Sequence, residues 1–390
     1  METSNPGKLK EGLSLDSFDF LFLSNGYGED AIAAKIAEVL KDERRSAAFP
    51  LIGRGISYEN KGIPVLMSFS ELPSAGVSLF QDFKSGLVRR VAAEWRTTKK
   101  WGRKARFMIA VGDIFPVFLA QFSVNLPIVF IGTAKSHYVQ EYNFLERVLL
   151  KKNVKNFVRD KVTAEILNKK KVHADFVGNP MMDESLENRC RIPNFDGLVI
   201  TLLPGSRSEF AENFLIQVES LQFLQKLTGG RIQGIAHLPP ALNPQIFVSK
   251  LNGWDGVTIN RTPFILGAYK QGEVSLLVMQ NSLGDALHAS TLVLGQAGTG
   301  NEQAAGTGKP VVAFDLEFSR NGKLSWYRWR QKKLLGDALA IVKADSKLLA
   351  AKVFFILQNR DVYQKMSEEG KMRMGPSGGS QKIAGFLRTL

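Results

Sequence analysis

Cysteine and histidine are scarce in this sequence. The 390 residues include one cysteine, Cys190, and four histidines that lie far apart along the chain. A single cysteine excludes an internal disulfide and suits a reducing compartment, so we expect the protein in the cytoplasm or a plastid stroma. The shortage of both residue types also argues against a zinc site, because Cys and His are the usual zinc ligands.

Long hydrophobic runs are also missing. The longest apolar stretch, residues 107–134, contains Asp113, Pro116 and Pro127, which indicates a strand, a turn, a helix and a second strand and not a membrane span. Residues 1–17 are polar and lack the apolar core of a signal peptide, so we expect a flexible tail. With 44% hydrophobic and 23% charged residues, the composition excludes collagen, coiled coil and general disorder.

Positive charge is in excess and unevenly distributed. The chain has 51 Lys and Arg residues against 37 Asp and Glu residues, a net charge of +14. Residues 84–106 carry nine cations and one acid, and residues 320–333 carry six cations and no acid. Because these two segments account for the whole excess, they indicate a localised anionic partner such as lipid head groups, nucleic acid or phosphates.

Short apolar runs alternate with amphipathic stretches along the chain. In the first half we expect strands at 18–23, 48–52, 107–111, 128–131 and 175–177, and helices at 31–40, 80–104, 116–122 and 141–151. In the second half we expect strands at 198–203, 232–236, 256–259, 275–279, 292–294 and 310–314, and helices at 209–227, 301–307, 346–374 and 381–390. Apolar strands separated by helices predict parallel sheets that are buried on both faces.

The predicted fold class is therefore α/β, with two doubly wound Rossmann-like domains facing a cleft. The first domain spans 18–178 and the second 198–375, and the stretch 179–197, which contains two prolines and no clear periodicity, is the expected linker. A C-terminal helix lies within 376–390, with the first domain as a candidate packing partner. Ligands of such folds bind at the carboxyl ends of the strands, so we expect the binding residues in the loops that follow the strands.

Two loops of the second domain have the residues that bind phosphates. In Leu202–Glu209 an expected strand ends in Pro-Gly-Ser, and a helix is expected to follow. Gly205 would allow a ligand to approach the backbone closely, and the start of the helix offers free N–H groups. Arg207 adds a planar guanidinium with several donors. The alternative is a tight turn with a serine cap. In the second loop, Gly298, Thr299 and Gly300 can form a nest of amides, while Glu302 in the first helical turn could bind ribose or simply favour the helix dipole.

Two loops of the first domain also carry polar groups. Asn25–Asp30 follows a strand and opens a helix, so Gly26 and Gly28 could let a sugar or a lipid phosphate approach the backbone, although Glu29 and Asp30 also suit a helix cap. Asp113 is a lone carboxylate in an apolar run. Burial would raise its pKa and make it a better base, and a cap for the helix near Pro116 is an equal alternative.

Together these motifs resemble the lipid-A-disaccharide synthases, and more closely the synthase-related proteins of cyanobacteria. The resemblance rests on Leu-Leu-Pro-Gly-Ser-Arg at 202–207, Ala-Gly-Thr-Gly-Asn-Glu-Gln-Ala at 297–304 and Phe-Val-Gly-Asn-Pro-Met-Met-Asp at 176–183. The cyanobacterial proteins also resemble this chain at Ser-Asn-Gly-Tyr-Gly-Glu-Asp, 24–30, and Gly-Thr-Ala-Lys-Ser, 132–136.

The resemblance implies a GT-B glycosyltransferase that moves a hexosyl or N-acylhexosaminyl group from a UDP-sugar to a lipid-linked acceptor, with inversion and with no metal or other cofactor. It implies a donor site in the second domain that consists of Gly205, Ser206, Arg207, Gly298, Thr299, Gly300, Glu302 and Gln303. Asp113 falls at the position of the proposed catalytic Asp, with Asp30 and Glu29 as further candidates. The implied acceptor site comprises Asn25, Gly26, Gly28, Lys135, Ser136 and His137.

The acceptor loops depart from the synthase pattern. Asn25–Asp30 stands where the synthases have Gly-Glu-x-Ser-Gly-Asp, and Thr133–His137 replaces an aromatic segment, so the identity of the acceptor stays open. His137 could equally be an ordinary surface or cap histidine. A nucleotide-sugar 2-epimerase on the same fold and a non-catalytic protein that binds sugar nucleotides are the alternative functions.

The two basic segments predict peripheral attachment to an anionic membrane through residues 80–106 and 318–335. In the first segment an apolar stripe (Phe80, Phe83, Leu87, Val91 and Trp95) lies opposite a basic stripe (Arg89, Arg96, Lys100 and Arg103), and the second segment mixes three aromatic residues with six cations. The alternative is a helix whose apolar side packs on the core. No nucleic-acid motif is present, so nucleic acid is not expected, and a homodimer is left open.

Overall fold

The computed structural model describes residues 17–67, 87–185, 188–206, 209–239, 242–259, 262–317 and 323–390. Residues 1–16, Phe80, Phe83, Arg207 and 318–322, for which the sequence makes predictions, lie outside these ranges. The chain divides into two compact units. The first comprises Met1–Pro180 together with Gly378–Leu390, and the second comprises Met181–Ser377.

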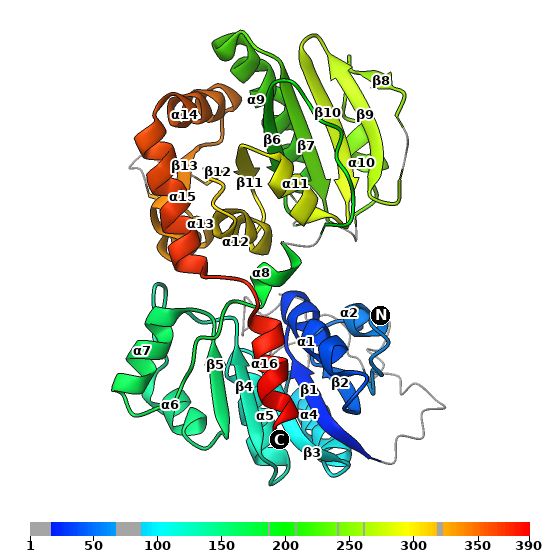
Figure 1. Ribbon diagram of the computed structural model, residues 1–390, viewed down its shortest axis with the longest axis vertical. Coiled ribbons are helices and arrows are strands. Elements are labelled where there is room, and N and C mark those ends of the chain that lie inside the picture. Colours follow the sequence, from blue (N-terminus) through cyan, green and yellow to red (C-terminus); the bar gives the residue numbers. More distant parts are fainter. Residues whose placement is uncertain are drawn as a thin grey trace. The chain divides into compact units, whose positions relative to one another are not determined.

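The first unit is built on a five-stranded parallel sheet with strand order β2-β1-β3-β4-β5 (Figure 1). Its strands are β1 (Phe18–Ser24), β2 (Ser46–Pro50), β3 (Ala105–Gly112), β4 (Ile128–Gly132) and β5 (Lys155–Val158). Apart from a few positions near their starts, the strand residues are buried. The strands are apolar on both sides because helices cover both faces of the sheet.

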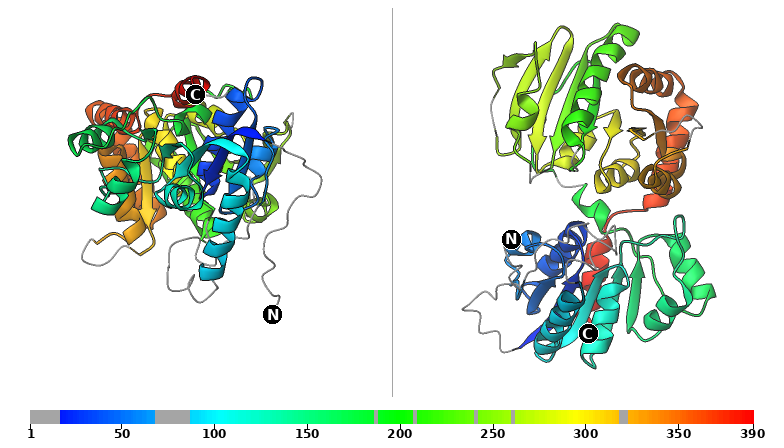
Figure 2. Two further views of the ribbon diagram at one scale, coloured as in Figure 1. Left: turned by 90° about the horizontal axis from the view of Figure 1, so that it is seen from below. Right: turned by 180° about the vertical axis from the view of Figure 1, so that it is seen from behind.

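Helices on the two faces of the first sheet come from different parts of the chain. They are α1 (Tyr27–Leu40), α2 (Ile56–Glu59), α4 (Leu87–Gly102), α5 (Phe115–Ser123), α6 (Phe144–Leu150), α7 (Lys161–Lys169) and α16 (Gly379–Arg388). The C-terminal helix α16 packs beside α1, and Phe386 makes an edge-on ring contact with Phe157 of β5. Helices α4 and α5 cover the opposite face, which is seen from behind in Figure 2.

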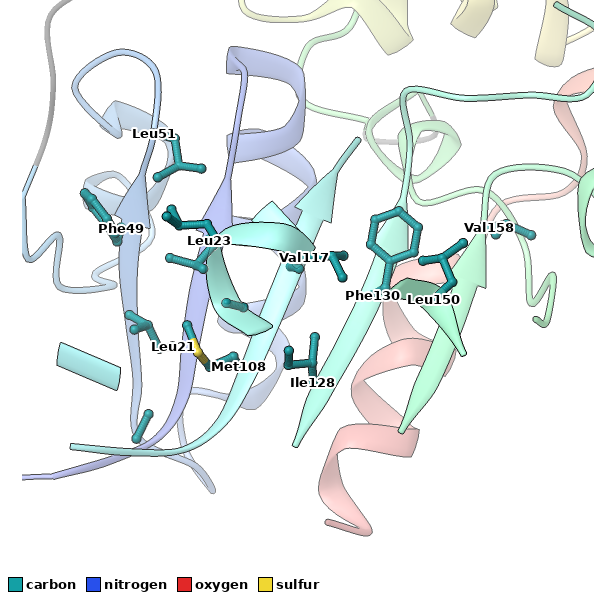
Figure 3. Packing of buried hydrophobic residues seen from close by; sticks show 14 of the residues in the cluster. Leu21, Leu23, Phe49, Leu51, Met108, Val117, Ile128, Phe130, Leu150 and Val158 are labelled. Atoms are coloured by element: carbon teal, nitrogen blue, oxygen red, sulfur yellow. The ribbon is translucent and has the colours of Figure 1, made fainter. Parts of the chain in front are cut away.

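The core on the α4–α5 side is shown in Figure 3. Leu21 and Leu23 of β1, Met108 of β3 and Phe130 of β4 pack there with residues from the covering helices, among them Val117 of α5 and Leu150 of α6. These side chains are essentially inaccessible to water. Each such residue contributes about 1.5–3 kcal/mol by leaving water, so this layer holds α4, α5 and α6 against the sheet.

The second unit contains an eight-stranded sheet with strand order β13-β12-β11-β6-β7-β10-β9-β8. Its strands are β6 (Leu198–Leu203), β7 (Ile232–Leu238), β8 (Asp255–Val257), β9 (Ile265–Gln271), β10 (Val274–Gln280), β11 (Leu292–Gly295), β12 (Val311–Asp315) and β13 (Leu339–Lys343). Near one edge of the sheet, β9 runs antiparallel to both of its neighbours, β8 and β10. The rest of the sheet is parallel, as in the first unit.

Helices cover both faces of the second sheet as well. They are α8 (Met181–Glu184), α9 (Phe210–Thr228), α10 (Gln245–Val248), α11 (Leu283–Ala289), α12 (Thr299–Gly306), α13 (Trp326–Leu335), α14 (Ser346–Gln358) and α15 (Arg360–Met374), with a 3₁₀ turn at Gly336–Ala338. Leu202 and Leu294 pack with residues of α9 and α14, whereas Leu203 and Val293 pack with residues of α12 on the other side. Successive residues of one strand therefore serve opposite layers.

The predicted fold class, two doubly wound α/β domains, is confirmed, and the details differ in places. Residues 175–177 do not form a strand: Asp175 makes a single bridge to Phe157, and the edge strand is β5. The expected helix 346–374 is two helices that meet at Asn359. The stretch 179–197, expected as a linker, contains α8, and its residues Cys190, Ile192 and Phe195 pack on the second unit's core.

Within the part of the chain that the structure describes, no helix combines the length and the apolar character needed to cross a bilayer.

Substitution of Leu387 tests the docking of α16. This side chain is fully buried, so Leu387→Ala should lower the free energy of unfolding by about 2–5 kcal/mol. Leu145→Ala is the matched control, because Leu145 lies in the same unit and is 71% exposed, and it should change the free energy by about 0.5 kcal/mol or less. Urea denaturation of both variants checks this, and equal effects would contradict the packing of α16.

Candidate functional site

A large pocket lies in the second unit, at the carboxyl ends of β6, β11 and β12. It has a volume of about 710 Å³, within the range of small-molecule sites. Because Gly295 is paired with Leu203, the loops that leave β6 and β11 start side by side. The parallel register therefore brings two glycine-rich turns, far apart in sequence, to one place.

The turn after β6 requires a glycine. Gly205 has φ of +85°, a backbone conformation that side chains disfavour. A Cβ atom at this position would lie 3.0 Å from the carbonyl oxygen of Gln296, so the two loops also pack closely. In turn, the backbone N–H of Gln296 donates to the Leu203 carbonyl at 2.7 Å. The loops thus support each other at the pocket wall.

The turn after β11 leads directly into α12. Gly298 is the N-cap residue of this helix, and the pocket is lined by Gly298, Thr299 and Gly300. N–H groups in the first turn of a helix have no intrahelical acceptor and carry partial positive charge. Because Gly298 and Gly300 have no side chains, a phosphate group could approach these N–H groups at the start of the helix.

Buried amide side chains of α9 hold the pocket loops from behind. Asn213 donates its side-chain N–H to the Pro204 carbonyl at 3.0 Å. Gln217, which is inaccessible to water, donates to the carbonyls of Leu203 at 3.2 Å and Leu294 at 2.9 Å. A buried carbonyl without a partner is costly, so these bonds fix the ends of β6 and β11.

A second polar network holds the other side of the turn after β11. The buried Asn301 amide donates to the Gly295 carbonyl at 3.0 Å and to Gln331 Oε1 at 3.2 Å. Gln331 in turn donates to the Ala297 carbonyl at 2.9 Å, and Arg328 donates to Gln331 Oε1 at 2.8 Å. The network binds carbonyl oxygens of the loop to α13, so the loop is preorganised.

The remaining wall of the pocket was not predicted from the sequence. It comes from β12 and the start of α13, and includes Phe314, Asp315, Trp326 and Tyr327. The signal was present as a second apolar strand, 310–314, followed by an aromatic segment, but the segment was assigned to a membrane. Aromatic side chains beside a glycine-rich turn offer flat apolar surfaces on which a planar group of a ligand can stack.

His237, at the carboxyl end of β7, also lines the pocket. Burial lowers the pKa of its imidazole to about 4, so the ring is neutral at physiological pH. Its Nε2 accepts the backbone N–H of Ser282 at 3.3 Å, which leaves the proton on Nδ1. In the sequence this histidine is one of four that lie far apart, and no motif marks it.

Most of the predicted donor residues gather in this pocket. Those that line it are Gly205, Ser206, Gly298, Thr299, Gly300 and Gln303. The Gln303 amide is buried and donates to the Met181 carbonyl at 3.0 Å, so its role includes holding α8. Glu302 is not among the lining residues, and Arg207 lies outside the described ranges between two residues that do line the pocket, Ser206 and Glu209.

The first unit has its own group of polar side chains at the carboxyl ends of β1, β3 and β4. Gly112 at the end of β3 has φ of +126°, and a Cβ there would lie 1.8 Å from Asn25 Oδ1. Since Gly112 pairs with Gly132 of β4, both strands end in glycine at the same level. The missing side chains leave room for Asn25 to reach across the end of β3.

Asp113 follows directly and is partly buried in this group. Its Oδ1 accepts the backbone N–H of Phe115 at 2.8 Å, so it does support the start of α5. Burial raises the pKa of its carboxyl, and this effect outweighs the hydrogen bonds from Phe115 and Asn25 and the positive charge of Lys135, which lower it. The helix-start contact and a raised basicity therefore occur together at Asp113.

Lys135 connects this carboxyl to two residues that sequence reasoning missed. Its Nζ lies 2.5 Å from Glu146 Oε1 and 5.6 Å from the centre of the Tyr142 ring. The Tyr142 hydroxyl is buried and has no hydrogen-bond partner within the described part of the chain. Burial and the charges of Glu146 and Asp113 raise the pKa of Tyr142, so its hydroxyl stays neutral and can donate or accept a hydrogen bond.

Asp30 lies in the first turn of α1 and is almost inaccessible to water. Its Oδ1 accepts the Ser24 hydroxyl at 2.6 Å, and Ser24 in turn is 2.7 Å from the Tyr58 hydroxyl. Burial raises the pKa of Asp30 to about 7, and the negative charge of Glu29 adds to this effect. The N-cap residue of α1 is Gly26, which has no side chain for a cap, and Asp30 lies in the first turn of the helix, where a negative charge is favourable.

The other residues predicted for the first unit occupy varied positions. Glu29 accepts the Thr133 hydroxyl at 3.3 Å, and Gly26 is the N-cap of α1, whose first turn includes Gly28. Ser136 is buried, so a contact with an acceptor would require it to move. His137 is held towards α7, with its backbone N–H on Thr163 Oγ1 and its Nδ1 3.5 Å from Glu141 Oε1.

The aromatic residues of the first basic segment do not form a free apolar stripe, whereas Trp326 and Trp329 of the second segment are 64% and 45% exposed. Trp95 packs against the core of the first unit and donates its ring N–H to the Phe122 carbonyl at 2.8 Å. Trp101 is buried. In the second segment Trp326 lines the pocket and Arg328 is buried in its wall. For α4 the alternative, a helix whose apolar side packs on the core, is therefore the one that the geometry supports.

Comparison with known proteins gives the fold. No protein-family model matches the chain, and no curated protein matches its sequence. A protein of Listeria monocytogenes assigned as a UDP-N-acetylglucosamine 2-epimerase is 14% identical, with a TM-score of 0.60 over 96% of each chain. A calicheamicin glycosyltransferase is also 14% identical, with a TM-score of 0.59 over 95% of this chain and 98% of the other. MnaA of S. aureus, solved with UDP, is 12% identical, with a TM-score of 0.59 over 95% and 96%.

The chain has the GT-B fold. At these identities the likeness does not show which reaction a GT-B protein catalyses, so function must be argued from the sites. Among the residues that the structure describes, no group of three or more His, Cys, Asp or Glu side chains could hold a metal ion.

The raised pKa of Asp30 predicts a pH-dependent stability. The folded state holds this proton up to about pH 7, whereas the unfolded chain releases it near its ordinary pKa of 3.8. The free energy of unfolding should therefore fall as the pH rises from about 4 to 7, by ~4 kcal/mol at most. Asp30→Asn should remove this decline.

Urea denaturation at pH 5 and pH 8 provides the measurement. The loss of stability between the two values should be smaller in Asp30→Asn than in the wild type. Asp42→Asn is the control, because Asp42 is exposed in the turn after α1. An unchanged loss in Asp30→Asn would show that Asp30 is ionised throughout this range.

Proposed function

We propose that the protein is an inverting glycosyltransferase that moves a hexosyl or N-acylhexosaminyl group from a UDP-sugar to a lipid-linked acceptor. The observation that carries the proposal is the pocket of the second unit, where two glycine-rich turns and the start of α12 meet beside aromatic side chains. Its volume of about 710 Å³ suits a nucleotide-sugar. The resemblance of both turns to the synthase motifs supports the same ligand.

The donor diphosphate would bind at Gly298–Gly300, where first-turn N–H groups provide positive potential without a metal. Arg207 would add a charged donor fork to the same phosphates. As the bond between the anomeric carbon and the diphosphate oxygen breaks, negative charge grows on the departing UDP. Donors that are already fixed in place stabilise this charge most effectively, and the buried amide networks behind the loops provide such fixation.

Asp113 is the proposed general base. In its ionised form the carboxylate takes the proton of the acceptor hydroxyl, and the hydroxyl oxygen then forms the bond to the anomeric carbon on the face opposite to UDP. A raised pKa makes the carboxylate a stronger base, as this step requires. Lys135, next to Asp113 and paired with Glu146, would bind an anionic group of the acceptor.

A 2-epimerase is the second candidate. It is favoured by the presence of two carboxyl groups with raised pKa, Asp30 and Asp113, in the same unit, because epimerisation requires acid and base groups at one sugar. The two functions differ in what they need: an epimerase converts a UDP-sugar alone, whereas a transferase releases UDP only in step with an acceptor. Incubation of the protein with UDP-N-acetylglucosamine, with and without extracted lipids, separates them.

Arg207 provides the test of the donor site. Arg207→Ala should weaken UDP binding by about 10- to 100-fold, because a charge-assisted hydrogen bond contributes roughly 1.5–3 kcal/mol. Calorimetric titration with UDP measures this directly. Arg231→Ala is the matched control. Arg231 precedes β7, at the amino end of the strand and away from the pocket, so its replacement should leave the affinity unchanged. Equal affinities for all three proteins would refute the placement of the diphosphate.

Asp113→Asn provides the test of the chemistry. Asparagine keeps the oxygen that accepts the Phe115 N–H, but it cannot take a proton. Turnover should fall by about 10²–10⁴-fold, while UDP affinity stays near that of the wild type. Lipid extracts incubated with a radiolabelled UDP-sugar give the rate. A rate near normal in Asp113→Asn would move the role of base to Asp30 or Glu29.

A further inference from the structure

The outer side of α5 and α6 in the first unit exposes large apolar side chains. Phe118 and Phe122 of α5 are 41% and 58% exposed, and Phe144, Leu145 and Val148 of α6 are 69%, 71% and 37% exposed. These five residues, the apolar patch, contribute nothing to the buried core. Exposed apolar residues are common singly, whereas a group on adjoining helices indicates an interaction surface.

Contacts between the helices make this group one surface. The rings of Phe118 and Phe122 are 4.5 Å apart, one turn from each other along α5. Gln121 of α5 donates its amide to the Leu149 carbonyl of α6 at 2.8 Å. Phe118 lies one turn before Gln121 on α5, and Leu145 lies one turn before Leu149 on α6, so exposed apolar residues of both helices lie close to this contact.

Positive charge surrounds the apolar patch. Helix α4, which packs beside α5, exposes Arg96 and Lys100, and Arg103 is exposed just after its end. Lys151 and Lys152 are exposed directly after α6. The only carboxylates within α4, α5 and α6 are Glu94 and Glu146, and both are buried in pairs with Arg90 and Lys135. Within these three helices the exposed charges are therefore positive, and the exposed Glu141 before α6 is paired with Lys170.

An open hollow adjoins the apolar patch at the ends of α4 and α5. It has a volume of about 320 Å³ and is lined by Lys99, Arg103 and Asn125 together with small and apolar residues. Ser123 of its lining follows Phe122 directly in sequence. A hollow with two cations and an amide beside exposed aromatic rings matches a phosphate head group whose lipid chains continue over the rings.

We infer that this layer, formed by α4, α5 and α6, binds the surface of an anionic membrane. The apolar patch enters the boundary between head groups and acyl chains, and the cations of α4 and of the α6 end contact lipid phosphates. The position differs from the one that the sequence predicted, because Trp95 and Trp101 of the basic segment point into the protein and the inserting residues belong to the neighbouring helices.

The charge and the side chains favour this partner over others. A second copy of the chain would bring cations against cations, which disfavours self-association through this layer. Nucleic acid would pair with the cations but would leave the aliphatic Leu145 and Val148 exposed. A lipid bilayer satisfies both features at once. Helix α5 begins two residues after Asp113, so a membrane bound here would hold a lipid-linked acceptor near the proposed base, although the binding itself does not rest on the proposed function.

Vesicle flotation tests the inference with the full chain. The wild type should float with vesicles of phosphatidylcholine that contain one third phosphatidylglycerol, and far less with phosphatidylcholine alone. Raising the salt from ~0.1 M to ~1 M shortens the Debye length from ~10 Å to ~3 Å and should release much of the protein. A wild type that remains unbound on anionic vesicles at low salt would overturn the inference.

Two variants locate the surface. Phe144→Gln with Leu145→Gln, and separately Lys100→Gln with Arg103→Gln, should each lower the partition coefficient by roughly tenfold, since each removes two groups that the membrane would contact. Leu227→Gln with Leu348→Gln is the control for lost apolar surface, because both leucines are exposed in the second unit. Lys41→Gln with Lys382→Gln is the control for lost charge, because Lys41 is exposed at the end of α1 and Lys382 is exposed on α16. Equal losses in variants and controls would show that attraction is not specific to this layer.

Two further measurements separate the alternatives. Circular dichroism and calorimetric titration with UDP on each variant should match the wild type, because the altered residues are exposed and lie outside the donor pocket. A protein that floats but transfers no sugar would support the membrane surface and reject the transferase. A dimer in solution that dissociates in the Phe144→Gln, Leu145→Gln variant would assign this layer to self-association and overturn the lipid proposal.

Discussion

Parallel pairing of buried strands is the constraint on which both sites of this protein depend. In each unit it aligns the carboxyl ends of neighbouring strands, as shown by Gly112 opposite Gly132 and by Gly295 opposite Leu203. Loops that leave these ends must start side by side, although long stretches of chain separate them. Any group that these loops carry is therefore concentrated at one edge of the sheet.

Close packing of the strand ends limits the residues that can stand there. At Gly205 and Gly112 the backbone adopts positive φ and a neighbouring loop lies where a Cβ would be. The loops are in turn fixed by buried amides such as Gln217 and Asn301, which bind carbonyl oxygens from behind. Flexible glycine turns would give a poor binding site by themselves. The amide networks make them rigid, and rigidity is what allows backbone N–H groups to stabilise a developing charge.

Burial gives the two carboxyl groups of the first unit different properties. Asp30 is enclosed with Ser24 and Tyr58, and burial raises the pKa of its carboxyl to about 7. Asp113 is partly open and lies beside Lys135, so it can exchange a proton with a ligand. In the sequence Asp113 is the first candidate for the base and Asp30 is a further one, and only the tertiary structure shows that they differ in exposure and in the charges beside them.

The sequence by itself determined the fold class, most elements and the two phosphate-type turns, because hydrophobic periodicity and glycine-rich loops are local signals that do not depend on distant residues. It did not yield the short edge strand β5, the strands β9 and β13, or helix α13, where polar residues interrupt the pattern or packing overrides propensity. Only the tertiary structure could show that Trp95 packs inward while Phe118 and Leu145 face solvent, or that His237 and Phe314 line the same pocket. An amphipathic helix has an apolar side whatever it contacts, and which surface covers that side is decided by the elements that the chain folds against it.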